Sequence, residues 1–176
     1  MKFRNILVLI FLSLISISMV NANILSKFPN NFVKDNTAKV TFILGVNAQI
    51  YDGIAASLIL ASMQRYYLDK GINFIYTFVV DKDVDSLKDI NAIVIGGSCV
   101  NMVTAELFEY PLRCSAPFKP GKGRIKAFSN NIIFVGGYYW QDTINAAKAL
   151  SNFRKIDFES DDVEIESEEY AYLMIS

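Results

Sequence analysis

Apolar runs that end in glycine, each followed by a short loop and a helical pattern, occur three times in this chain. The segments are FILGVNAQIYDGIAA, IVIGGSCVNMVTA and IIFVGGYYWQDTINAA. A continuous apolar run indicates a strand that is buried on both faces. Repeated strand-then-helix units favour a parallel or mixed sheet with helices on its faces. The pattern predicts an α/β domain of three layers, loosely Rossmann-like, with a mixed and mostly parallel sheet flanked by helices.

The same patterning locates the individual elements. Strands are expected at 39–45, 73–80, 92–97, 124–128, 132–137 and 163–166. Helices are expected at 52–68, 100–108 and 142–153. The strands at 124–128 and 132–137 flank Ser129-Asn130-Asn131 and are typical of a hairpin. A long loop with three prolines precedes them, over 110–123.

The first 22 residues have the composition of a secretory signal peptide. Lys2 and Arg4 precede an apolar run over 6–20, and Val20-Asn21-Ala22 forms a small-residue cleavage site. The alternative is an uncleaved anchor, although the run is short for a span of about 20 residues. Contact with a membrane is expected only through this segment, if it is uncleaved. We therefore expect a leading segment at 23–37, a domain at 38–156, and an acidic tail at 157–176 that ends in a candidate strand.

Composition and charge limit the classes of function that this chain can have. The chain has 17 basic and 18 acidic residues, so its net charge gives no reason to expect a nucleic acid partner. It contains no histidine, which removes the usual general base and the commonest transition-metal ligand. We expect no enzymatic activity and no cofactor. Cys99 and Cys114 are the only cysteines, and in an exported chain they favour a disulfide over a metal site. Two buried free thiols are the alternative.

The glycines and acids at the predicted strand ends have two interpretations. Gly-Gly turns can cradle phosphate at a helix N-terminus, and Asp52 with Asp142 can form a carboxylate pair. However, neither a dinucleotide-binding motif nor a P-loop motif is present, and Ser98 does not lie in a nucleophile elbow. Turn geometry and helix capping explain these residues more simply. The residues assigned to turns and caps are Gly45, Asp52, Gly96, Gly97, Asn101, Gly136, Gly137, Asp142 and Thr143.

Charge and aromatic clusters indicate a possible interaction surface. Five basic residues and no acidic residue lie between Arg113 and Lys126. This basic cluster is followed along the chain by eight acidic residues between Asp157 and Glu169. The two are either solvated surfaces, or they attract one another within a protomer or between protomers. Three successive aromatic residues cannot all face inward, so at least one should lie at a surface. The candidate surface residues are Arg113, Lys119, Lys122, Arg124, Lys126, Tyr138, Tyr139 and Trp140.

The C-terminus, YAYLMIS, is an apolar finish to the acidic run. Such a terminus on an exported protein can pack on its own domain or add as a strand to a neighbouring molecule.

An ordered set of motifs over residues 28–153 resembles a known family. The motifs are IGGSCVN at 95–101, a second cysteine at 114, PG at 120–121 with IK at 125–126, and VGGY at 135–138 with DT at 142–143 and AA at 146–147. They are similar to V-G-G-P-C-x-N, P-G-x-x-x-I-K, V-A-G-Y and D-T-x-x-A-A in the S-layer-like domain of archaeal surface-layer proteins. Upstream, FPNNFVKDNTAKVTFILGVNAQIYDGIAAS resembles that family's N-terminal pattern. Ser98 replaces the family's proline, and Gly136 replaces its alanine.

The resemblance implies an exported, non-enzymatic structural protein at the cell surface of an archaeon. Its expected partners are copies of itself or a larger S-layer subunit. Lattice-forming members are usually far longer and often glycosylated, whereas this chain is short and has no N-x-[ST] sequon. A secreted binding module for a small anionic ligand is the alternative function.

Overall fold

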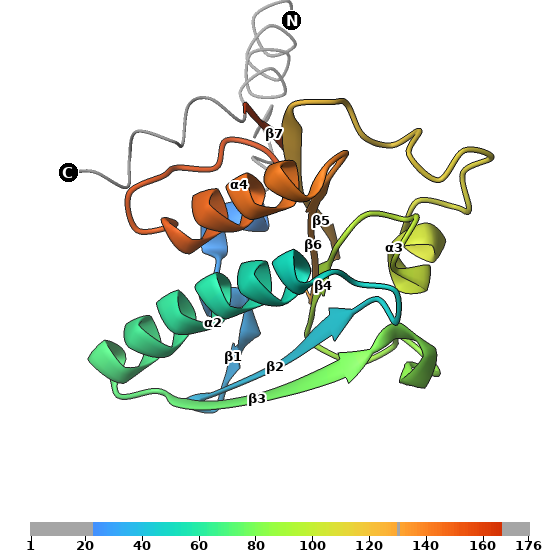
Figure 1. Ribbon diagram of the computed structural model, residues 1–176. Coiled ribbons are helices and arrows are strands. Elements are labelled where there is room, and N and C mark those ends of the chain that lie inside the picture. Colours follow the sequence, from blue (N-terminus) through green and yellow to red (C-terminus); the bar gives the residue numbers. More distant parts are fainter. Residues whose placement is uncertain (1–22, 130, 167–176) are drawn as a thin grey trace, which may run out of the picture.

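The computed structural model describes residues 23–129 and 131–166, so the predicted signal peptide and the end of the acidic tail lie outside the described residues. The expected strands and helices are present with shifted ends (Figure 1). The strands are β1 (Val33–Lys34), β2 (Thr37–Leu44), β3 (Asn73–Val80), β4 (Ala92–Ile95), β5 (Lys122–Ser129), β6 (Ile132–Gly137) and β7 (Asp162–Glu166). The helices are α2 (Ile50–Lys70), α3 (Met102–Leu107) and α4 (Trp140–Ser151). Short 3₁₀ turns occupy Leu25–Lys27, Asn30–Phe32 and Asp81–Asp83.

All seven strands belong to one mixed sheet. From one edge to the other, the order is β3, β2, β4, β6, β5 and β7. β2 is parallel to β3 and β4, and β4 is parallel to β6, whereas β5 runs antiparallel to both β6 and β7. β1 pairs antiparallel with the beginning of β2. The sheet is therefore parallel in the middle and antiparallel towards β7.

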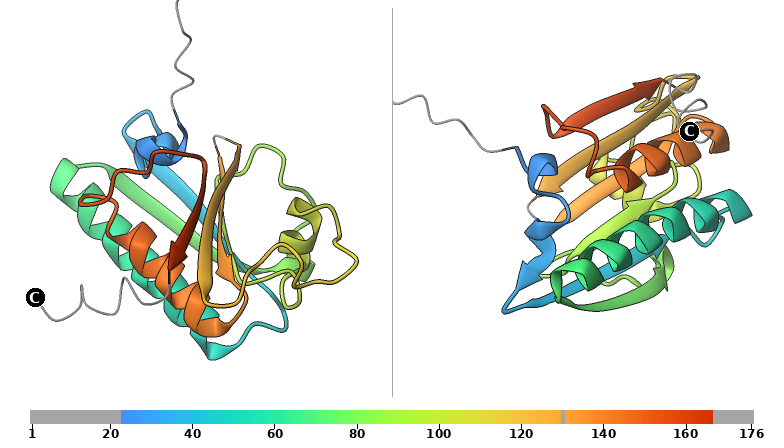
Figure 2. Two further views of the ribbon diagram at one scale, coloured as in Figure 1. Left: turned by 90° about the horizontal axis from the view of Figure 1, so that it is seen from above. Right: turned by 90° about the vertical axis from the view of Figure 1, so that its left-hand side faces the viewer.

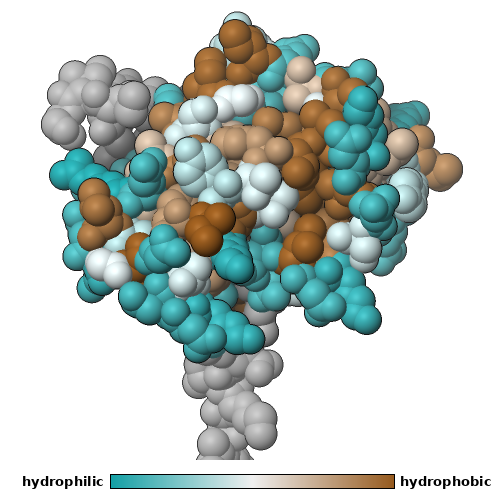
Figure 3. Space-filling model, turned by 90° about the horizontal axis from the view of Figure 1, so that it is seen from below, coloured by the Kyte–Doolittle hydropathy of each residue, from teal (hydrophilic) through white to brown (hydrophobic). Residues whose placement is uncertain are grey.

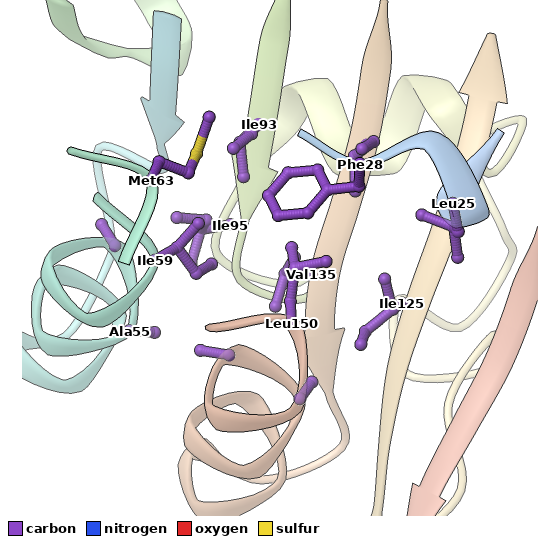
Figure 4. Packing of buried hydrophobic residues seen from close by; sticks show 14 of the residues in the cluster. Leu25, Phe28, Ala55, Ile59, Met63, Ile93, Ile95, Ile125, Val135 and Leu150 are labelled. Carbon is purple, nitrogen blue, oxygen red and sulfur yellow. The ribbon is translucent and has the colours of Figure 1, made fainter. Parts of the chain in front are cut away.

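The main core lies on one face of this sheet. Helices α2 and α4 pack side by side over it, and the Ser62 hydroxyl of α2 donates to the Ser151 carbonyl of α4. Ile59, Ile95 and Val135 meet between the helices and the strands (Figure 4). Residues of the leading segment and of β7 are buried in the same cluster: Leu25, Phe28, Phe32 and Ile165. The leading segment and the first part of the acidic tail are thus integral to the domain.

The expectation of a three-layer Rossmann-like sheet is wrong. The connection from β2 through α2 to β3 moves towards one edge, and the connection from β6 through α4 to β7 moves towards the other. Two right-handed crossovers in opposite directions would place their helices on opposite faces. Here α2 and α4 share one face, so the two connections have opposite hands and the second helical layer does not form.

The opposite face has only partial cover. Six-residue α3 packs its Val103 with Ile43, Ala92 and Val94, and the loop over 109–121 covers part of the remainder. The mixed sheet curls strongly across its width, as half of a barrel does (Figure 2). The result is a strand-rich curled sheet with helices mainly on its concave side, rather than a sheet flanked by helices.

Candidate functional site

The carboxyl ends of the central strands β2, β4 and β6 lie beside the N-termini of α2 and α4, at one end of the strands. A cavity of ≈ 240 Å³ lies there, lined by residues of the predicted turns, of the Cys99 loop and by four aromatic residues. Ligands of open α/β sheets commonly bind at the carboxyl ends of the strands. This cavity is therefore the candidate functional site, and its chemistry depends on the polar groups around it.

Asn101 joins the strand ends to helix α3. Its side-chain oxygen accepts hydrogen bonds from the backbone nitrogens of Val103, at 3.0 Å, and Thr104, at 3.2 Å. Its side-chain nitrogen donates to the carbonyl oxygens of Ile95, at 2.9 Å, and Ile43, at 3.3 Å. The side chain is 1% exposed and uses its full hydrogen-bonding capacity inside the fold. Asn101 thus caps α3 and also links β2 to β4.

Asp52 and Asp142 begin their helices in the same way. Each is the third residue of its helix, not the residue before it, and each carboxylate accepts from the backbone nitrogen of the residue preceding the helix. The distances are 3.1 Å from Gln49 to Asp52 and 3.0 Å from Tyr139 to Asp142. Both side chains are buried, and burial raises the pKa of Asp52 although the backbone hydrogen bond acts in the opposite direction. Negative groups thus already lie at the two positive helix ends where an anion would bind.

Two of the predicted turn glycines are required by their surroundings. A Cβ on Gly45 would overlap the carbonyl oxygen of Val100, so β2 can pass the α3 loop only without a side chain. Gly96 has a φ of 97°, in the region that favours glycine. Gly97 follows Gly96 in the connection after β4. Gly136 and Gly137 were expected in a turn but are the last residues of β6, and Thr143 lies in the first turn of α4.

The structure contains a disulfide between Cys99 and Cys114. It connects the turn after β4 with the long loop that precedes β5. The Ser98 hydroxyl donates to the carbonyl oxygen of Cys114, so Ser98 holds the same loop. Within residues 23–129 and 131–166, no group of three or more His, Cys, Asp or Glu side chains could hold a metal ion.

The predicted basic surface is paired inside the protomer. Four of its residues contact the acidic strand β7, as one of the two sequence interpretations requires. The guanidinium of Arg124 binds the Asp162 carboxylate through two hydrogen bonds, of 2.7 and 2.6 Å. The other pairs are Lys126 with Asp162 at 3.0 Å, Lys122 with Glu166 at 2.6 Å, and Lys119 with Glu164 at 2.8 Å. Arg113 lies apart from this group, exposed in the long loop.

This charge ladder changes the acidity of its members. Burial raises the pKa of Asp162, but the hydrogen bonds and charges of Arg124 and Lys126 together hold that pKa below its usual value. A hydrogen bond from Lys119 lowers the pKa of Glu164. The ladder therefore stabilises the carboxylate forms of β7, and it holds β7 against β5.

The aromatic residues lie at the rim of the cavity. Tyr138, Tyr139 and Trp140 are 39%, 54% and 41% exposed, and all three contribute to its lining. The Trp140 ring stacks on Tyr51, with centroids 3.9 Å apart. Tyr51 was not singled out from the sequence, although it directly precedes Asp52 in one of the three repeated segments. The two matched helix starts thus pack against each other through one stacked pair, of which Trp140 lines the cavity.

The exposure of β3 was not predicted. The run NFIYTFVV was expected to be a strand, without a place in the sheet, and β3 lies at the edge and pairs, among the described residues, with β2 alone. Ile75, Tyr76 and Phe78 are 46%, 45% and 43% exposed. Figure 3 views the molecule from the side of β3 and shows apolar side chains at the surface there. Periodicity cannot distinguish a central strand from an unprotected edge strand, and this explains the miss.

No helix within the described residues is long and apolar enough to span a bilayer. The disulfide fits an extracellular location, since such bonds persist in oxidising surroundings.

Comparisons with known proteins found similar solved structures but no match in sequence. No family model matches the chain, and no curated protein matches it in sequence. A solved structure described as "Structure of CpGH84D" is similar over 73% of this chain, with 15% sequence identity and a TM-score of 0.45. The matching part is 20% of that structure's chain, so this protein spans about a fifth of its length.

Proposed function

We propose that this chain is an exported, non-enzymatic structural protein of an archaeal cell envelope, which binds either copies of itself or a larger S-layer subunit. The observation that carries the proposal is the unprotected edge strand β3, whose apolar side chains are exposed on both faces of the sheet. Adding a strand to such an edge is a common way to bind another protein chain. The ordered S-layer-like motifs and the disulfide support the proposed location.

The polar groups at the cavity support a structural role over a chemical one. Ser98 and Asp52 line the cavity, and Asn101 and Asp142 lie next to lining residues in the sequence. Each forms hydrogen bonds within the fold, around the strand ends. For a small anionic ligand, the alternative, Asp52 and Asp142 would be unfavourable neighbours because they place carboxylates at both helix N-termini. The geometry therefore gives no specific observation in favour of an anion site.

Cell fractionation tests the proposed function. In cells that make this protein, we expect most of it to stay with washed envelopes and to be released by Ile75→Lys combined with Thr77→Lys. Leu112→Lys is a matched control, because Leu112 is fully exposed in the loop over 109–121 and lies away from β3. Wild-type protein found mainly in the cytosol, or free in the medium, would contradict the proposed function.

A further inference from the structure

Within the described residues, the edge of β3 that faces away from β2 has no partner strand, and it is long and regular. Its eight residues pair with β2 in an unbroken parallel register from Asn73 to Val80. The strand contains no proline, no charged residue and no bulge. Natural sheets usually protect an edge by one of these devices, because unpaired backbone groups are a template for another strand. β3 therefore has the properties of an edge that is used for pairing.

We propose that β3 pairs antiparallel with β3 of a second copy of this chain, around a two-fold axis perpendicular to the sheet. This inference rests on the proposed function only in that both use the same edge, and it names the partner. An axis of this kind keeps the two copies of α2 on the same face of the joined sheet. It therefore places Tyr76 or Thr77 opposite its own symmetry mate at the centre of the interface.

Charge favours a second copy in this orientation. The strand itself is uncharged, so two copies meet without like-charge repulsion. Lys70 ends the helix that precedes β3, and Lys39 of β2 pairs in register with Ile75. The Asp69 carboxylate beside Lys70 is paired with Arg154. Asp83 and Asp85 follow the strand, with Lys82 offsetting one of them. Antiparallel pairing brings the basic end of each copy beside the acidic end of the other, whereas parallel pairing would bring like ends together.

The side chains of β3 also suit a copy of themselves. On the face that carries α2, a row of aromatic contacts runs along the strand, from Tyr67 to Phe74 at 4.8 Å, Phe74 to Tyr76 at 5.6 Å, and Tyr76 to Phe78 at 6.1 Å between ring centroids. The row is half exposed at Tyr76 and Phe78. A second β3 continues the same row across the axis, because antiparallel partners place their side chains on the same face and aromatic cross-strand pairs are favourable.

Lysine substitution of the purified full chain tests this pairing. Ile75 and Thr77 lie on the face away from α2. With Tyr76 at the centre, Ile75→Lys of one copy lies opposite Thr77→Lys of the other. With Thr77 at the centre, the two copies of Thr77→Lys lie opposite one another. We expect wild type to form a concentration-dependent dimer in sedimentation equilibrium. The double variant should weaken this dimer by about 30-fold, and Leu112→Lys should leave it unchanged. A wild-type monomer at all concentrations, or a dimer indifferent to the two lysines, would overturn the proposal.

Cysteine cross-linking tests the orientation. Directly opposed residues of antiparallel strands lie within reach of a disulfide, so Tyr76→Cys or Thr77→Cys should give a covalent dimer under mild oxidation. Asn73→Cys is the matched control, since it would lie about 20 Å from its mate in this arrangement. Cross-linking at Asn73 as efficient as at the centre would refute the antiparallel geometry. A monomer in solution that is still retained by envelopes would remove the self-pairing and leave the proposed function standing.

Discussion

The two edge strands of this sheet, β7 and β3, differ in how far they are protected against pairing with a further strand. β7, with the sequence DVEIE, carries an acidic residue at every second position, and those residues pair with the basic side chains of β5 and of the loop before it. β3, with the sequence NFIYTFVV, carries no charge and exposes apolar groups on both faces. Charge on an edge discourages further strand pairing, and its absence permits it. The difference indicates that the chain protects one edge and leaves the other available to a partner.

The packing of the two strands differs as well. β7 alternates strictly, so that Val163 and Ile165 enter the core while its acids face outwards. On β3, Phe74 packs against the main core and Val79 against the smaller cluster on the opposite face, whereas Ile75, Tyr76 and Phe78 remain exposed. The apolar side chains of β7 are thus packed within one protomer, whereas β3 retains apolar surface that a second strand can cover.

A lysine on β7 should lower the stability of the fold far more than a lysine on β3, and this should be the largest effect. Ile165→Lys on β7 buries an unpaired ammonium group where only 4% of the native side chain is exposed. It should lower the free energy of unfolding by about 4 kcal/mol. Urea titration at fixed pH measures the loss. A loss as small as that of Ile75→Lys would contradict the packing contrast.

Removing the disulfide should have the next largest effect on the free energy of unfolding. It should leave the pairing of both edge strands unchanged. Cys99→Ser with Cys114→Ser opens a loop spanning 15 positions. This should lower the free energy of unfolding by about 3 kcal/mol. Reductant should destabilise wild type similarly and leave the double variant unchanged. Under native conditions β3-dependent dimerisation should persist; its disappearance would show that edge pairing depends on the disulfide loop.

Acid should weaken β7 selectively. The folded state lowers the pKa of Asp162 and Glu164, so their contribution to stability is present above the unfolded pKa values, about 4, and is lost as pH falls through the folded values. Buried Asp52 has a raised pKa and acts in the opposite direction, because its folded environment favours the protonated form.

The matching variant is Asp162→Asn combined with Glu164→Gln. It should lower the free energy of unfolding at pH 7 by about 1 kcal/mol, a small value because solvent screens these half-exposed pairs. It should also flatten the loss of amide protection in β7 between about pH 5 and pH 3. Hydrogen exchange of the β7 amides measures both effects. An equal change in the β3 amides would contradict the assignment to this edge.

The smallest effect on stability should come from the edge that matters most for association. Ile75→Lys places a charge on a half-exposed side chain, so it should change the free energy of unfolding of the monomer by less than about 0.5 kcal/mol. Thermal unfolding at high dilution measures this change without the dimer. A large loss would mean that Ile75 supports the fold, and its effect on association would then need another explanation.

Local patterns in the sequence were sufficient for the elements and for several residues of the site. The strands, the three helices and the Asn101 cap depend on side chains within a few positions of one another, so periodicity and capping chemistry reveal them. Gly45 is different, because its need for glycine comes from the Val100 carbonyl oxygen of a distant loop. Asp52 and Asp142 were correctly associated with helix starts, although they lie inside the first turn instead of before it.

Tertiary structure alone decided the layer arrangement and the exposure of each strand. The hand of each connection and the face on which α2 and α4 lie depend on contacts between distant segments, and no local pattern records them. Arg124 and Asp162 are 38 positions apart, and only the pairing of β5 with β7 brings them together. The sequence by itself determined that β3 is an apolar strand. Its place at the edge, and hence its availability to a partner, follows from how the whole sheet is assembled.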